Sequence, residues 1–73
     1  SGYLFLEFDS NKEGLTNMEI FNTAGQLMKK YAIKITKGYN QFKITVSDIR
    51  QGMYLLRVNN SEINITRRFV IAR

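Results

Sequence analysis

The 73 residues suffice for one domain with a thin core, since a chain this short buries little more than about 60% of its unfolded surface. The absence of cysteine and histidine excludes disulfides and thiolate chemistry, and it removes the commonest general base and metal ligand. The net charge of +5 indicates either a binder of nucleic acid or anionic surfaces, or a solvated basic face that keeps sheet edges from pairing. No basic run lies beside exposed stacking aromatics, so the second interpretation is favoured and no nucleic-acid partner is expected. No apolar run approaches the roughly 18 residues of a membrane-spanning helix, so no membrane insertion is expected either.

The first third of the chain predicts two strands. Residues 3–8 predict the first strand, in which Leu4, Leu6 and Phe8 share a face. Residues 9–14 are turn-forming and predict a loop. In the second strand, Thr16, Met18 and Ile20 share one face, and Phe21 lies on the other.

The acidic loop contains Asp9, Asn11 and Glu13 at alternate positions, which could indicate a calcium site. The further oxygen ligands of an EF-hand-type loop are missing, so we interpret these residues as a solvated turn. No metal or other cofactor is therefore expected.

The middle of the chain predicts a hairpin turn and two more strands. Gly25, in the turn at 22–25, can take a positive φ without steric cost. Apolar residues in 26–36 recur at spacing two and not at 3.6, so a strand is favoured over a helix, although Lys29 interrupts its apolar face. The segment 36–40, with Gly38 and Asn40, is predicted to turn the chain into a fourth strand, in which Phe42, Ile44 and Val46 share a face. Five lysines cluster around this predicted hairpin: Lys29, Lys30, Lys34, Lys37 and Lys43.

One apolar residue, Ile49, lies in the polar segment 48–52. A side-chain oxygen of Ser47 or Asp48 could accept hydrogen bonds from N–H groups two or three residues on and close a single helical turn. Ile49 would then point inward as a plug between two sheets. Gly52 would reverse the chain into the next strand.

The last third predicts two strands joined by a turn at 59–61. The first carries Tyr54, which we interpret as a core aromatic with an anchored hydroxyl rather than a stacking platform. The second runs to the end of the chain, but Arg67 falls on its apolar face. Either a bulge near Thr66–Arg67 shifts the register, or Arg67 extends to solvent at a sheet edge with its stem packed. The apolar face of the last strand comprises Ile63, Ile65, Phe69 and Ile71.

Turn signals every 8 to 14 residues and the lack of any helix pattern predict an all-β fold, a small antiparallel Ig-like β-sandwich of about six to seven strands. The carboxylates are scattered, without a partner base or an activated nucleophile, so no enzyme activity is expected. The whole chain is expected to form one domain, and Ser1 and Gly2 could be residues added in cloning.

Four motifs resemble, in order, the C-terminal sorting domain of proteins exported by the type IX secretion system of Gram-negative bacteria. Residues 18–27 are similar to the strand, polar turn and glycine of this family, and residues 38–44 to its Gly-x-Asn turn entering a strand. Two motifs follow near the end of the chain. They comprise Ile49, Gly52 and Tyr54, then Arg68, Val70 and Arg73.

Two features depart from the family pattern. Arginine stands at Arg67, Arg68 and Arg73 where lysine is more usual, which keeps the charge but alters hydrogen-bond geometry. The opening Asn-Pro segment is absent, so either the chain lacks the first strand of the domain or this member is atypical there. A missing strand would leave an unpaired sheet edge, and a homodimer formed by strand exchange is then expected.

The resemblance implies a secretion signal rather than an enzyme. It implies that the domain directs a larger cargo protein across the outer membrane, passing through the periplasm to the cell surface or the medium. The expected partners are the outer-membrane secretion machinery, a shuttle protein and a surface cysteine protease that usually removes the domain. The residues expected to be recognised lie in the last two strands: Gly52, Tyr54, Arg68, Val70 and Arg73. Strand addition or edge docking is the expected mode. The alternative is an Ig-like or fibronectin-like accessory module that binds glycan or protein.

Overall fold

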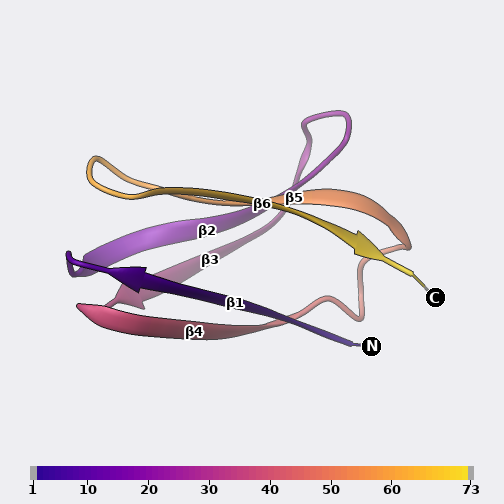
Figure 1. The fold of residues 1–73 in the computed structure, drawn as a ribbon. Coiled ribbons are helices and arrows are strands. Elements are labelled where there is room, and N and C mark those ends of the chain that lie inside the picture. Colours follow the sequence, from indigo (N-terminus) through magenta and orange to yellow (C-terminus); the bar gives the residue numbers. More distant parts are fainter. Residues whose placement is uncertain (1, 73) are drawn as a thin grey trace.

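Six antiparallel strands form two facing sheets in the computed structural model, which describes residues 2–72 (Figure 1). The strands are β1 (Tyr3–Ser10), β2 (Gly14–Asn22), β3 (Leu27–Ile35), β4 (Gly38–Thr45), β5 (Gly52–Asn59) and β6 (Asn64–Ile71). The described residues contain no helix, so the all-β sandwich expected from the sequence is confirmed, including the strand character of residues 27–35. None of the described elements is a helix long and apolar enough to cross a membrane.

The two sheets differ in size. One contains only β1 and β4, and the other has the order β3-β2-β5-β6, with β2 and β5 at its centre. The hairpins β2–β3 and β5–β6 lie within the larger sheet, while the chain changes sheet between β1 and β2, between β3 and β4, and between β4 and β5. Four strands therefore have a free edge: β1, β4, β3 and β6.

The core lies between the sheets and is built by the alternation of each strand. The apolar faces predicted for the strands point inward, so period-2 alternation located the core correctly. Burial of this apolar surface is the main term that favours folding of so small a domain. The most deeply buried side chains are Ile20, Ile35, Ile44, Leu56 and Val58.

The structure corrects the predicted hairpin between the third and fourth strands. β3 and β4 belong to different sheets, and β4 pairs with β1 from Tyr3↔Thr45 to Ser10↔Gly38. The five lysines are therefore not gathered on one hairpin. Lys43, for example, lies over the ring of Tyr3 on β1, with its Nζ 3.9 Å from the ring centroid.

The connection between β3 and β4 is held by the side chain of Asn40. This side chain is 5% exposed and accepts hydrogen bonds from the N–H and hydroxyl of Thr36, at 2.9 and 3.2 Å. Its amide nitrogen donates to the carbonyls of Thr36 and Gly38, at 2.9 and 3.1 Å. Gly38 adopts φ 95°, as its predicted turn role requires. Asn40 itself lies inside β4 and not in the turn, because the strand begins four residues earlier than its apolar alternation suggested.

Ile49 fills the end of the core between the sheets, as predicted. It is 5% exposed, and its N–H donates to the carbonyl of Val46 at 3.1 Å, which closes a four-residue turn instead of a helical one. Within this turn, Asp48 forms an ion pair with Lys29, whose Nζ lies 2.7 Å from Asp48 Oδ2. The hydrogen bond to Asp48 is the largest of the effects that raise the pKa of Lys29. This pairing explains why a lysine interrupts the apolar face of β3.

The register between β5 and β6 is unbroken from Gly52↔Ile71 to Asn59↔Asn64. Of the two explanations for Arg67, the bulge is therefore wrong. Arg67 is an exposed residue on an edge strand, on the same side as Ile65 and Phe69. Long cationic side chains at such positions keep their charge in water.

Candidate recognition surface

The outer face of β5 and β6 brings together two of the residues that the motifs single out. In the antiparallel register Arg68 lies opposite Leu55, and Val70 lies opposite Met53. All four side chains point away from the core, because they alternate with inward residues such as Tyr54. Val70 is 64% exposed.

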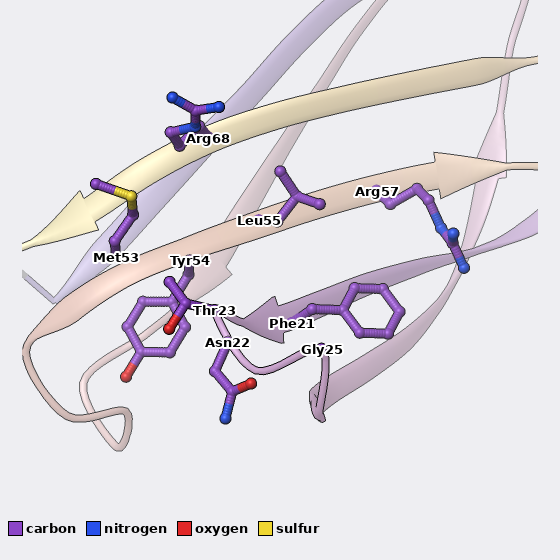
Figure 2. Close-up of a pocket in the computed structure, with 9 residues that line it drawn as sticks. All are labelled: Phe21, Asn22, Thr23, Gly25, Met53, Tyr54, Leu55, Arg57 and Arg68. Carbon is purple, nitrogen blue, oxygen red and sulfur yellow. The ribbon is translucent and has the colours of Figure 1, made fainter.

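A shallow hollow of about 540 Å³ lies on this face and extends to the β2–β3 turn (Figure 2). Phe21 of β2 lies opposite Leu55 and forms its floor together with that residue. Arg57 and Arg68 supply positive charge at its border. The residues that line the hollow are Phe21, Asn22, Thr23, Gly25, Met53, Tyr54, Leu55, Arg57 and Arg68. We call these residues, together with Val70, the β5–β6 outer surface.

The two arginines differ in how they are held. Arg57 Nη2 lies 3.2 Å from Glu19 Oε1, and its guanidinium lies 5.0 Å from the centroid of the Phe21 ring. Its Nε is buried without a hydrogen-bond partner among the described residues. Arg68, in contrast, makes no side-chain hydrogen bond or ion pair within residues 2–72, so its charge is available to a partner.

Gly52 and Tyr54 shape the start of β5 from inside. The Tyr54 hydroxyl donates to the carbonyl of Arg50 at 2.7 Å, and its ring stacks on Phe69 with centroids 5.8 Å apart. The anchored core tyrosine expected from the sequence is therefore confirmed. Gly52 adopts φ 150°, which disfavours other residues. A Cβ there would meet the Tyr54 ring at 3.6 Å, an ordinary contact, so backbone conformation and not lack of space requires the glycine.

The turn before β3 closes the other end of the hollow. Gly25 has φ 84° and its N–H donates to the carbonyl of Asn22 at 3.0 Å. The side-chain oxygen of Asn22 accepts from the N–H groups of Ala24 and Gln26, at 3.0 and 2.9 Å. The role predicted for Gly25 as a turn residue is confirmed. This turn fixes the rim of the hollow.

Three of the other expected site residues do not join this surface: Gly38 and Asn40 lie at the start of β4, and Ile49 lies in the turn before β5. Arg73 lies outside the described residues. Tyr39, weighed as a stacking residue, donates its hydroxyl to the carboxylate of Glu7 on the smaller sheet, and this bond raises the pKa of Tyr39.

Sequence reasoning did not single out several residues of the surface as recognition residues, among them Phe21, Met53, Leu55 and Arg57. A signal was present, because β5 carries apolar residues at both its inward and its outward positions. A strand at the centre of a sheet with one solvated face should alternate apolar and polar residues. Apolar residues in the outward phase therefore distinguish this face from an ordinary solvated one.

Comparison with known families identifies the chain. The family model described as a secretion system C-terminal sorting domain matches residues 1–72. The chain belongs to this family. No curated protein and no solved structure matches it.

A sorting domain of this family is a signal for export by the type IX secretion system, to the cell surface or into the medium. The sorting domain therefore interacts with the secretion machinery, and the family is not one of enzymes. Within residues 2–72 no group of three or more acidic side chains is placed to hold a metal ion.

Proposed function

We propose that the secretion machinery recognises this sorting domain through the β5–β6 outer surface, with Arg68 and Val70 as the principal contacts. The observation that carries the proposal is the unpaired charge of Arg68 beside exposed apolar side chains. Exposed apolar patches bordered by charge are typical of protein-binding surfaces. The partner surface is therefore apolar with an acidic residue opposite Arg68.

Side-chain docking on this face is favoured over strand addition at β6. The β6 edge carries Arg67 and Arg68, and basic residues on an edge oppose pairing with another strand. Gly52 and Tyr54 contribute indirectly in this scheme, because they fix the start of β5 and so the position of Met53. Arg73 adds a second positive charge near the end of the chain.

Membership of the sorting-domain family supports a further proposal, the order of events in export. The domain crosses the periplasm with its cargo, is bound at the outer membrane by a shuttle protein, and is removed at the surface by a cysteine protease. Mass spectrometry of a released reporter would detect the removal, since the cargo would lack these residues. A reporter that keeps the whole domain at the cell surface would contradict this last step.

The proposal is tested with a reporter protein that carries residues 1–73 at its C-terminus in a type IX secreting host. Arg68→Glu should abolish export of the reporter, because it places a carboxylate against an acidic partner. Lys34→Glu, the same charge change on the exposed β3 edge, should leave export intact. Circular dichroism of the isolated domains should be unchanged for both variants.

A second variant tests the apolar part of the surface. Val70→Asp changes an exposed apolar residue and should also reduce export at least tenfold without changing the thermal midpoint by more than a few degrees. Export that persists in both Arg68→Glu and Val70→Asp would show that another surface is recognised. Export lost equally in Lys34→Glu would show that net charge and not this surface matters.

Self-association by strand exchange, also expected from the sequence, stays a prediction. Sedimentation over a dilution series tests it, because an exchanged dimer dissociates slowly compared with one held by surface contact alone. Slow return of monomer after dilution would support exchange. Return of monomer within the dead time would argue against it.

A further inference from the structure

We infer that the free edge of β1 pairs with β1 of a second copy of this chain, which joins the two small sheets into one sheet of order β4-β1-β1-β4. This inference does not rest on the recognition surface proposed above, although Arg68 and Val70 of that surface border two of the hollows described below. It starts from a difference among the four free edges. Two strands paired in isolation are marginally stable, so the smaller sheet gains most from extension.

Three of the free edges are protected against strand addition by basic residues. β3 carries three lysines and β6 two arginines, and of these Lys29 and Arg67 lie on the inward-facing side of their strands. β4 carries Lys43. Basic and inward-pointing charged residues are the usual protection of an edge strand. β1 has no basic residue and no proline, and its inward positions are Leu4, Leu6 and Phe8.

The outward side of β1 is also apolar at its start. Tyr3 and Phe5 are both more than half exposed. The two acidic residues, Glu7 and Asp9, lie in the second half of the strand, and Glu7 is engaged by the hydroxyl of Tyr39 on β4. An uncharged, strongly β-forming stretch at 3–6 thus lies on an open edge, which is the pattern that promotes pairing.

The backbone groups available on this edge can be assigned. Gly2 accepts a hydrogen bond at its carbonyl from Val46 N–H at 2.9 Å, so Gly2 is bonded toward the β4 side. Bonding directions alternate along an antiparallel strand. The N–H and C=O groups of the odd residues therefore face the free edge. These residues are Tyr3, Phe5, Glu7 and Asp9.

Hollows lie along one side of the sandwich, between β1 of the smaller sheet and β6 of the larger sheet. Their volumes are about 550, 340 and 130 Å³. Apolar side chains from both sheets line them, including Phe8 with Ile65, and Leu4 with Phe69. A strand added to β1 would cover these openings with its own inward side chains.

β1 of a second copy can pair at this position. A two-fold axis at Leu6 places Leu4 opposite Phe8 of the second copy and Phe5 opposite Glu7, so that odd residues exchange hydrogen bonds with odd residues. This register pairs all of residues 3–9 and puts no like charges opposite each other. An axis at Glu7 would place two carboxylates face to face, which disfavours it. The second copy is therefore the occupant that the edge fits.

Sedimentation equilibrium of the 73-residue chain over a dilution series tests the inference. The mass should rise with concentration toward twice that of one chain. Phe5→Lys, which adds a basic residue to the β1 edge, should raise the dimer dissociation constant at least tenfold. Met28→Lys is the matched control, since Met28 is similarly exposed on an edge strand of the other sheet, and it should leave the constant within twofold.

The register is tested by oxidation, because the chain has no cysteine of its own. The double variant Phe5→Cys/Glu7→Cys should form a disulfide-linked dimer, while neither single variant should, because each thiol would lack its opposite. A chain that stays monomeric at every concentration overturns the inference. So does an equal effect of Phe5→Lys and Met28→Lys, or a dimer in which the double-cysteine variant does not crosslink.

Discussion

Tyr54 and Arg68 represent two kinds of residue within the same motif region. Tyr54 points into the core and bonds the carbonyl of Arg50, so it fixes where β5 begins. Arg68 points to solvent from the neighbouring strand and makes no ion pair within residues 2–72. In the proposed recognition mode a partner contacts the second kind of residue, and the first kind holds the second in place.

Tyr54→Phe separates these roles. The variant loses the hydrogen bond to the Arg50 carbonyl but keeps the ring against Phe69, so the free energy of unfolding should fall by about 1 kcal/mol. Urea denaturation followed by circular dichroism measures this change. Export of the reporter should stay at the wild-type level. A folded Tyr54→Phe variant that is not exported would mean that the partner contacts the hydroxyl.

Ile49→Ala should lower the free energy of unfolding by about 2–4 kcal/mol, because the side chain is 5% exposed and its removal leaves a cavity at the end of the core. A domain of this size has a small total stability, so the thermal midpoint should fall steeply. Val70→Ala is the control, since an exposed residue should change the stability by less than about 0.5 kcal/mol. Equal effects of the two substitutions would contradict the plug.

At the scale of elements, the connection between β3 and β4 depends on a single buried amide. Asn40 makes four hydrogen bonds across this connection, which carries the chain from the larger sheet to the smaller one. A buried polar group stabilises a connection only while its partners are satisfied. The smaller sheet is therefore positioned by a side chain and not by the turn alone.

Asn40→Ala should cost about 1–3 kcal/mol of stability, because it removes the four hydrogen bonds that this buried side chain makes to Thr36 and Gly38. Asn40→Asp should cost at least as much, since the carboxylate cannot donate to the two carbonyls and carries a buried charge. Chemical denaturation provides the comparison, with Gln41→Ala, an exposed neighbour on the same strand, as the control. A harmless Asn40→Ala would show that the turn holds itself.

The ion pair between Lys29 and Asp48 links β3 to the Ile49 turn and makes a pH prediction. Because the folded pKa of Lys29 is raised, the contribution of the pair is fully present below the ordinary lysine value of 10.5 and is lost as the pH rises through the folded pKa. Asp48 is 62% exposed, so the contribution should be below about 1 kcal/mol.

Comparison of the wild type with Lys29→Met measures this contribution. The difference in unfolding free energy should be constant from pH 7 to 9 and shrink above 10.5, and it should also shrink in high salt. Lys34→Met, at an exposed position of the same strand, should show no such dependence. A difference that grows with pH would contradict the pairing.

At the scale of the whole molecule, the sequence predicted which face of each strand points into the core better than it predicted which strands pair. Alternation at Leu4 and Leu6, or at Ile33 and Ile35, depends only on local period, and each of these residues is buried or half-buried as predicted. The partner of β4 is β1, which lies more than 30 residues earlier in the chain for most pairs, and no local pattern encodes that choice. The predicted hairpin failed for this reason.

The candidate surface was found only in part for a related reason. Arg68 and Val70 were indicated by family resemblance. Phe21 was expected on the face of its strand opposite Met18 and Ile20, but no local pattern indicated that it would lie beside Leu55, because that pairing follows from the register between β2 and β5. Arg67 also needed the structure for its explanation. It occupies an otherwise apolar face, which is possible because β6 is an edge strand.

The start of β1 and the end of β6 lie at the same end of the sandwich, where Tyr3 and Leu4 share a small hollow with Ile71 and Ala72 (Figure 1). A short glycine-serine bridge could therefore join the two ends, with a new opening in the 11–13 loop. Such a circular permutant would keep every surface of the domain while moving the free carboxyl end to the far side. Export of a reporter fused to this permutant would distinguish recognition of the folded surface from recognition of the free C-terminal end.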